Sequence, residues 1–217
     1  MKPGQSPQDE VIAANIEFYK RTTTGEYDYD HYEYCVSDRF IQRMVEKDLE
    51  VIASALSGKS RKIHCLDCGG GSGNLTLKML RRGWDVTVVD VSPDMLAAAD
   101  SKLKAVGYKP KLVNDSIENF LTTSRDVFDV VTFSSVLHHL YDPLNVIRTV
   151  ATRIAPGGFF YSNFDMPRPS NHFVTARFLD FDTFFAKFLL DKRDFLPGIF
   201  RRLRKLFTAI NSSMEGQ

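Results

Sequence analysis

The sequence predicts an α/β fold in which a mainly parallel, doubly wound sheet carries helices on both of its faces. Two observations lead to this prediction: short apolar runs alternate with helical patterns, and a glycine-rich turn joins the first run to the helix after it. Short apolar runs bounded by glycines are typical of buried parallel strands. The runs cover residues 63–66, 84–89, 111–114, 127–133 and 159–164.

Helices are predicted before the first strand, and they make residues 1–60 an N-terminal helical cap. Residues 9–20 carry apolar side chains at roughly helical spacing, and residues 37–56 form a clearer amphipathic helix. The apolar stripe of the second helix consists of Phe40, Ile41, Met44, Val45, Leu49, Ile52 and Ala53.

The first strand ends in a turn that carries Asp67 followed by Gly69, Gly71 and Gly73. Glycines let the backbone turn sharply and approach a ligand, because they have no Cβ. A short helix and the second strand follow, and Asp90 ends that strand. Open α/β sheets bind ligands at the carboxyl ends of their strands, where an acid after the second strand can accept hydrogen bonds from ribose hydroxyls.

The rest of the predicted core, residues 61–165, contains two further clear helix signals. One helix starts with Ser92 as the capping residue and Pro93 at the first helical position. The other covers 143–154 and is ended by the Pro-Gly-Gly at 156–158. The expected buried faces are Met95, Ala99, Leu103 and Val106 in the first helix, and Leu144, Ile147, Ala151 and Ile154 in the second.

The glycine spacing excludes two common nucleotide sites. The dinucleotide fingerprint G-x-G-x-x-G fails, because Asn74 stands where the third glycine would be. A phosphate-binding P-loop would end in Gly-Lys-Ser/Thr, and the turn has no such end. A short-chain oxidoreductase would need Tyr-x-x-x-Lys on the helix after the fourth strand, and this pair is absent there.

The succession of Asp67, the glycine turn and Asp90 resembles the first two motifs of the class I S-adenosylmethionine-dependent methyltransferases. The Leu-His-His-Leu run at 137–140 and the Pro-Gly-Gly before the fifth strand are similar to further segments of that family. The resemblance covers 63–164 and implies a Rossmann-like fold with S-adenosyl-L-methionine as the cofactor. A glycine-rich turn in another doubly wound protein is the alternative.

The resemblance also implies which residues hold the cofactor. Asp90 would bind the ribose, Met95 would pack on the adenine ring, and Asp115 would accept a hydrogen bond from the adenine amino group. A core methionine and a loop aspartate without a ligand are the competing interpretations of Met95 and Asp115. The expected set is Asp67, Gly69, Gly71, Gly73, Asp90, Val91, Met95, Asp115, Ser116 and Ser134.

In that family the helices before the first strand cover cofactor and substrate, often through an aromatic residue. Tyr27 and Tyr32 are the candidates here, with packing against the sheet edge as the alternative.

His138 and His139 are the candidate catalytic residues, because the fourth strand lies beside the first in this fold and its end would face the donor methyl group. Methyl transfer is an in-line displacement that needs donor and acceptor held collinear. A hydroxyl acceptor must also lose a proton, and histidine is the usual base near neutral pH. Lining of the pocket or capping of the next helix remains open, and an amine or acidic phenol would need no base.

Residues 166–217 are predicted to form an aromatic and basic helical extension. Phenylalanines follow a helical stripe, and the basic stretch 201–205 contains no acid. Such a segment would cover an apolar acceptor site, contact an acidic membrane surface or form a homodimer interface. In the resembling family a closing β-hairpin would follow the fifth strand, and none is evident in this sequence. A sheet edge would then stay uncovered unless a partner covers it.

Composition limits the partners and the compartment. A net charge of +1 over 217 residues gives no reason to expect nucleic-acid binding. Three cysteines, an odd number, argue against a disulfide framework and favour a reducing, cytoplasmic location. Cys35, Cys65 and Cys68 are all interpreted as small apolar residues. Cys35 is alone and no second pair completes a zinc site with Cys65 and Cys68, so no metal is predicted. The N-terminus lacks an uninterrupted apolar segment, so neither a signal peptide nor a transmembrane helix is expected.

The sequence therefore predicts an S-adenosylmethionine-dependent methyltransferase. Its acceptor would be a small or lipid-like molecule, methylated at oxygen, nitrogen or carbon. The alternative is a non-catalytic S-adenosylmethionine-binding module, or a partner subunit that lacks the closing hairpin.

Overall fold

The computed structural model describes residues 6–20 and 39–165. Tyr27, Tyr32, Cys35 and the predicted extension 166–217 lie outside the described residues, and so does the predicted lack of a closing hairpin. The described elements are α1 (Pro7–Lys20), α3 (Arg39–Ala55), β1 (His64–Cys68), α4 (Asn74–Arg81), β2 (Asp85–Asp90), α5 (Pro93–Ala105), β3 (Lys111–Asn114), α6 (Ile117–Thr123), β4 (Phe128–Ser134), the 3₁₀ turn η1 (Leu137–His139), α7 (Pro143–Ala151) and β5 (Ile154–Asn163).

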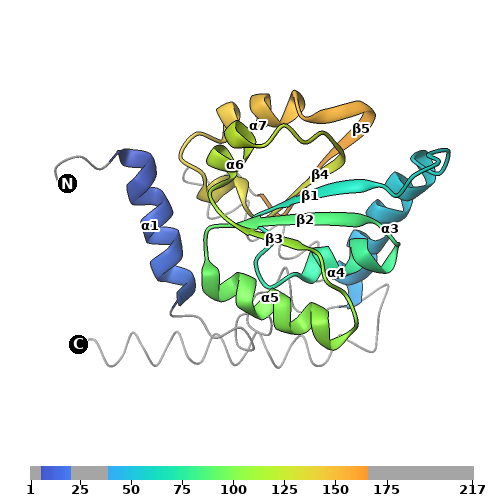
Figure 1. Ribbon diagram of the computed structural model, residues 1–217, viewed down its shortest axis with the longest axis horizontal. Coiled ribbons are helices and arrows are strands. Elements are labelled where there is room, and N and C mark those ends of the chain that lie inside the picture. The colour runs from blue at the N-terminus through green and yellow to red at the C-terminus, as the bar shows by residue number, and fades with distance from the viewer. Residues whose placement is uncertain (1–5, 21–38, 166–217) are drawn as a thin grey trace, which may run out of the picture.

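The strands form one five-stranded sheet in the order β3-β2-β1-β4-β5, and every pair is parallel (Figure 1). The central strand β1 lies between β2 and β4, so the chain reverses its direction of progress across the sheet at β1. Ligands bind at such a point, outside the carboxyl ends of the strands. The predicted fold class is confirmed.

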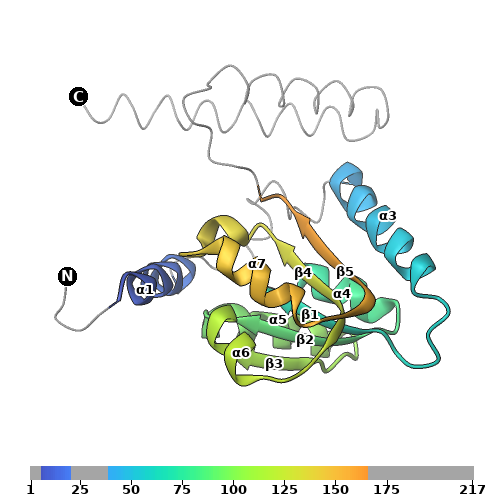
Figure 2. The same cartoon turned by 90° about the horizontal axis from the view of Figure 1, so that it is seen from above.

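Helices cover both faces of the sheet (Figures 1 and 2). Side chains of α3, α4 and α5 pack on one face, and those of α6 and α7 pack on the other. Side chains along β1 alternate between the two faces of the sheet. Cys65 packs with the core under α3, α4 and α5, whereas Leu66 and Cys68 pack with the core under α6 and α7. Both cysteines are buried, as their interpretation as small apolar residues requires.

Helix α5 starts as expected but ends earlier than its pattern indicates. The Ser92 hydroxyl accepts a hydrogen bond from the Met95 N–H at 3.3 Å, which caps the helix. Met95, Ala99 and Leu103 are buried. Val106 was expected on the same face but is 49% exposed, because it lies just past the last helical residue.

The expected course of the chain from α7 to β5 is wrong in two respects. The helix ends at Ala151, and it buries Val146 and Val150 instead of the expected face; Leu144 is 63% exposed. The Pro-Gly-Gly does not end the helix but lies inside β5, where the pairing with β4 shifts register. Gly157 has a left-handed φ of 74°, and a Cβ at Gly158 would lie 2.7 Å from the Asp129 carbonyl oxygen. These glycines therefore form a bulge that lets one strand continue.

Helices α3 and α6 also differ from what the sequence pattern predicts. In α3 the residues Val45, Leu49 and Ile52 are buried as expected, whereas Met44 is 51% exposed. Helix α6 has no counterpart in the sequence analysis, although Ile117, Phe120 and Leu121 are buried at helical spacing.

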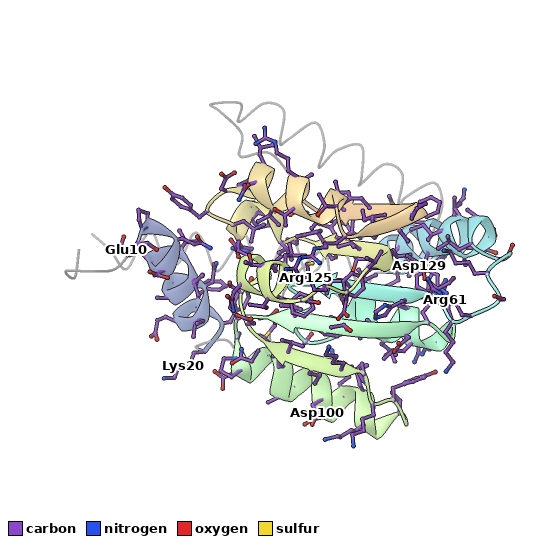
Figure 3. The ribbon with its side chains drawn as sticks, turned by 45° about the horizontal axis from the view of Figure 1, so that its top comes forward. Glu10, Lys20, Arg61, Asp100, Arg125 and Asp129 are labelled. Carbon is purple, nitrogen blue, oxygen red and sulfur yellow. The ribbon has the colours of Figure 1, made fainter. Side chains whose placement is uncertain are left out.

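Asp129 joins β4 to the segment before β1 at the amino edge of the sheet. Its buried carboxylate accepts hydrogen bonds from the Lys59 ammonium at 2.7 Å, the Arg61 guanidinium at 2.7 and 3.0 Å, and the His64 N–H at 2.8 Å. Figure 3 shows Arg61 and Asp129 side by side, at the opposite end of the molecule from Glu10 and Lys20 of α1. This cluster of ion pairs around Asp129 is remote from the candidate site.

Among the described residues, no helix combines the length and apolarity needed to cross a bilayer.

Candidate functional site

A pocket lies at the carboxyl edge of the sheet, between α1, the glycine turn and η1. The space between its walls is about 930 Å³ when the solvent in its open mouth is included. Helix α1 supplies one wall through Gln8, Val11, Ile12, Asn15 and Tyr19. The opposite wall consists of the glycine turn and the residues that follow β2, β3 and β4.

Asp90 joins the glycine turn to the start of α5. One carboxylate oxygen accepts a hydrogen bond from the Gly71 N–H at 2.9 Å, and the other accepts one from the Ser92 N–H at 2.8 Å. The residue is 8% exposed, and burial raises the pKa of its carboxyl group although both hydrogen bonds oppose the shift. The turn and the acid are therefore one structural unit that faces the pocket.

Gly71 has a φ of 53°, in the left-handed region that favours glycine. A Cβ placed there would meet Met95 Cε at 3.4 Å and nothing closer. A side chain at this position would thus be strained by the backbone alone, before any ligand is considered. Gly73 is different, because its Cβ would lie 3.2 Å from Ala99 Cβ of α5, and it does not line the pocket.

Asp67 is a buried acid at the base of the pocket. It is 1% exposed and accepts hydrogen bonds from the Thr76 hydroxyl at 2.6 Å and the Thr132 hydroxyl at 2.8 Å. Burial raises the pKa of Asp67 to about 6; the two hydroxyls lower it, and the negative charge of Asp90 raises it further. The protonation of this acid is thus sensitive to pH near neutrality.

The wall after β2 and β3 is formed by Val91, Met95, Ile117 and Glu118. Asp115 does not line the pocket, because its carboxylate accepts hydrogen bonds from the Asn119 side-chain amide at 2.8 and 3.0 Å and from the Ser116 N–H at 2.8 Å. Ser116 also lies outside the pocket lining and caps α6 through the Asn119 N–H.

The two candidate histidines occupy different environments. His139 lines the pocket, its Nε2 lies 3.3 Å from the Tyr19 hydroxyl, and its carbonyl oxygen accepts a hydrogen bond from the Asn15 side chain at 3.1 Å. His138 is outside the lining, and its Nδ1 lies 3.2 Å from an Asp165 carboxylate oxygen. The two imidazole rings are tilted by 41° to each other, with their centroids 4.2 Å apart.

The structure thus brings together most of the residues predicted from the sequence. Asp67, Gly69, Gly71, Asp90, Val91, Met95, Ser134 and His139 line the pocket, whereas Gly73, Asp115, Ser116 and His138 do not. Sequence reasoning missed Asn15, Tyr19 and Glu118. Tyr19 is the aromatic residue of α1 that reaches the site, and its place four residues after Asn15, on one helix face, is the signal that could have found it.

The charge of the pocket is negative. Asp67, Asp90 and Glu118 line it, and within residues 6–20 and 39–165 no lysine or arginine does. Such a pocket suits a cationic ligand and disfavours phosphates. No group of three or more histidine, cysteine or acidic side chains that could hold a metal occurs among the described residues.

Comparisons with known proteins agree with this geometry. Residues 66–160 match a family model described as a methyltransferase domain. The ubiquinone biosynthesis O-methyltransferase of Aliivibrio fischeri strain MJ11 is 34% identical over 109 residues, which are 50% of this chain and 45% of that protein. The enzyme of the same name from Aeromonas salmonicida strain A449 is 36% identical over 93 residues, 43% of this chain and 39% of that protein. The match thus spans less than half the length of these relatives.

Solved structures show the same fold. An S-adenosylmethionine-dependent methyltransferase from Clostridium acetobutylicum has a TM-score of 0.51 at 23% identity and covers 63% of this chain and 55% of its own. The N-methyltransferase NodS from Bradyrhizobium japonicum, in complex with S-adenosyl-L-homocysteine, has a TM-score of 0.52 at 19% identity and covers 69% of this chain and 71% of its own.

Proposed function

We propose that this chain binds S-adenosyl-L-methionine in the pocket and transfers its methyl group to a small or lipid-like acceptor, because residues 66–160 match a methyltransferase domain model. The observation that carries the proposal is the buried Asp90 carboxylate, which holds the glycine turn at 2.9 Å and faces the pocket at the carboxyl edge of β2. An acid in this place binds ribose hydroxyls in related sheets.

The residues present fit the cofactor. Asp90 would bind the ribose, and the apolar side chains of Val91, Met95 and Ile117 would contact the adenine. The negative pocket would stabilise the positive sulfonium, whereas a dinucleotide would bring phosphates to a wall without lysine or arginine among the described lining residues. When bound, S-adenosylmethionine supplies an electrophilic methyl group on sulfur.

His139 is the residue that we assign to the acceptor. It lines the pocket after β4, beside Ser134, whereas His138 points toward Asp165. For a hydroxyl acceptor, the His139 imidazole would take the proton. The Tyr19 hydroxyl and the Asn15 amide would hold this residue in place from α1. The curated relatives are O-methyltransferases by name, which favours oxygen as the acceptor atom.

The remaining predicted cofactor residues have supporting roles in this proposal. Gly73 lets α5 pack closely against the glycine turn. Ser116 starts the helix that carries Ile117 and Glu118. Asp115 stays a predicted adenine contact. To bind the adenine amino group, its carboxylate would have to give up its hydrogen bonds from the Asn119 side-chain amide.

Transfer of label from S-adenosylmethionine tests the proposal. The chain is incubated with the tritium-labelled methyl donor and a small-molecule extract, and label in the organic phase is counted. Label should appear with the wild type and, at a donor concentration below saturation, fall roughly 10- to 150-fold with Asp90→Ala. A protein that binds S-adenosylhomocysteine but labels neither organic nor aqueous products would support the non-catalytic module instead.

Cytoplasmic location, peripheral membrane contact and a homodimer also belong to the proposal. The last two depend on the predicted extension 166–217, outside the described residues. Cell fractionation, flotation with anionic vesicles and light scattering of the full chain measure them separately.

A further inference from the structure

An acid that follows β5 holds the start of η1, the turn that carries His139. One carboxylate oxygen of Asp165 accepts hydrogen bonds from the Val136 and Leu137 N–H groups, both at 2.7 Å. The other oxygen accepts one from the Ser162 hydroxyl at 2.7 Å. The Asp165 side chain is 9% exposed and does not line the pocket. A carboxylate at the end of one strand thus caps a turn at the end of the neighbouring strand.

Val136 connects this carboxylate to His139. Its N–H donates to Asp165, and its carbonyl oxygen accepts a hydrogen bond from the His139 N–H at 2.9 Å. Val136 also packs closely against the glycine turn, because a Cβ at Gly69 would lie 2.6 Å from Val136 Cγ2. Both Val136 and His139 line the pocket. The place of His139 in the pocket therefore depends on Val136, which Asp165 and the glycine turn fix from two sides.

The backbone is strained just before these residues. Ser135 has a φ of 58°, in the left-handed region that is uncommon for residues other than glycine. Its N–H donates a hydrogen bond to the Asn163 carbonyl oxygen at 2.8 Å. Such conformations persist where the surrounding contacts fix them, and they cluster at functional sites. The hydrogen bonds to Asp165 supply two of these contacts, in the two residues that follow Ser135.

We infer that Asp165 is a positioning residue for methyl transfer, which acts through the turn 136–139 to hold His139 toward the acceptor. The inference deepens the proposed function and rests on it, in particular on His139 as the base. It gives a role in the reaction to a nearly buried acid that lies outside the pocket and that the mechanism proposed above does not use.

A double-mutant cycle with His139 tests the inference on the full chain. The tritium-labelled methyl donor and the small-molecule extract serve as probes. Asp165→Ala should lower methyl transfer roughly 10- to 100-fold, because a misplacement of about 1 Å has an effect of this size. Asp165→Asn keeps an oxygen that can accept from both N–H groups, so its rate should stay within about fivefold of the wild type. In the His139→Ala background, Asp165→Ala should change the remaining rate by less than about twofold.

Asp142→Ala is the matched control. Asp142 follows the same turn and caps α7 by accepting a hydrogen bond from the Asn145 N–H at 3.0 Å, but it does not line the pocket. Both variants lose a capping carboxylate, and only Asp165→Ala should slow methyl transfer. Binding of S-adenosylhomocysteine shows that each variant is folded. Should Asp165→Ala bind none, Asp165→Gln takes its place in the cycle, because its longer side chain displaces the accepting oxygen.

The position of His139 can also be measured without a cofactor. In NMR spectra of the ligand-free chain, its imidazole signal is assigned by its loss in His139→Ala. The signal should move in Asp165→Ala and stay in place in Asp142→Ala, since only Asp165 contacts the turn that carries the ring.

The outcomes separate the inference from the proposed function. If Asp165→Ala lowers the rate by the same factor with and without His139, leaves the wild-type rate unchanged, or leaves the His139 signal in place, the inference is wrong and the proposed function stands. A wild type that transfers no label refutes the proposed function, and the inference fails with it.

Discussion

We expect replacement of Asp90 by alanine to weaken the binding of S-adenosylhomocysteine roughly 10- to 150-fold. The lost interaction is a charge-assisted hydrogen bond to the ribose, and such bonds contribute about 1.5–3 kcal/mol. Asp90 is 8% exposed, so solvent cannot easily replace the missing acceptor.

The same substitution also has a cost in the stability of the fold. Alanine would leave the N–H groups of Gly71 and Ser92 without the carboxylate that accepts from them at 2.9 and 2.8 Å. An unsatisfied buried donor costs about 1–3 kcal/mol, and this cost lowers the free energy of unfolding because the two N–H groups lack an acceptor with or without ligand. Asp90→Asn keeps one acceptor oxygen and should therefore bind more tightly than Asp90→Ala but less tightly than the wild type.

Isothermal titration with S-adenosylhomocysteine measures these affinities. Asp85→Ala is the matched control, because Asp85 opens the same strand at the opposite edge of the sheet and is exposed. It should bind like the wild type. An affinity of Asp90→Ala within about threefold of the wild type, or an equal loss in the control, would refute the assignment of Asp90 to the ribose.

Three further outcomes are expected. Burial raises the pKa of Asp67 to about 6 from about 3.9 in an unfolded chain, so its ionisation costs folding free energy as pH rises from 4 to 7. Urea unfolding should show Asp67→Asn gaining on the order of 1–3 kcal/mol over the wild type between pH 5 and 8, and parallel pH dependences would contradict this. His139→Ala should lower turnover by about 10²–10⁴-fold with little change in S-adenosylhomocysteine affinity, and equal turnover in His139→Ala and His138→Ala would remove His139 as the base. Gly158→Ala should cost about 1–3 kcal/mol in melting experiments, because its Cβ would lie 2.7 Å from the Asp129 carbonyl oxygen. Gly58→Ala is the control with open space, and similar melting temperatures for both would contradict the overpacking.

The sheet was predictable because buried parallel strands leave a direct mark in the sequence. Strands β1 and β2 are nearly continuous buried runs. Gly69 follows β1 and Asp90 ends β2, and both residues line the pocket. The positions of Asp67, Asp90 and Met95 then follow from chain order alone, since the carboxyl ends of parallel strands meet at one edge.

The sequence-based predictions differed from the structure where a local pattern is compatible with two structures. Pro-Gly-Gly ends helices in many proteins, but here Gly157 and Gly158 form a bulge inside β5, which only the pairing with β4 reveals. Asp115 follows its strand as expected, yet Asn119, one helical turn later, binds its carboxylate. Such competition between a neighbour and a ligand does not appear in residue spacing.

The residues of α1 that line the pocket were not identified from the sequence, although the resemblance implied that helices before the first strand cover the cofactor. These residues are far from the core in the chain, and none of them is buried, so no strong apolar pattern marks the side facing the pocket. The contact between Tyr19 and His139 spans 120 positions and depends on tertiary packing.

A crystal structure of the chain with S-adenosylhomocysteine is the most direct test of the central claim. We expect both ribose hydroxyls within about 2.5–3.0 Å of the Asp90 carboxylate oxygens, as in ordinary hydrogen bonds between oxygen atoms. The sulfur should face Ser134 and His139. Ligand density outside the pocket, or a ribose that bonds elsewhere while Asp90 keeps only Gly71 and Ser92, would contradict the account.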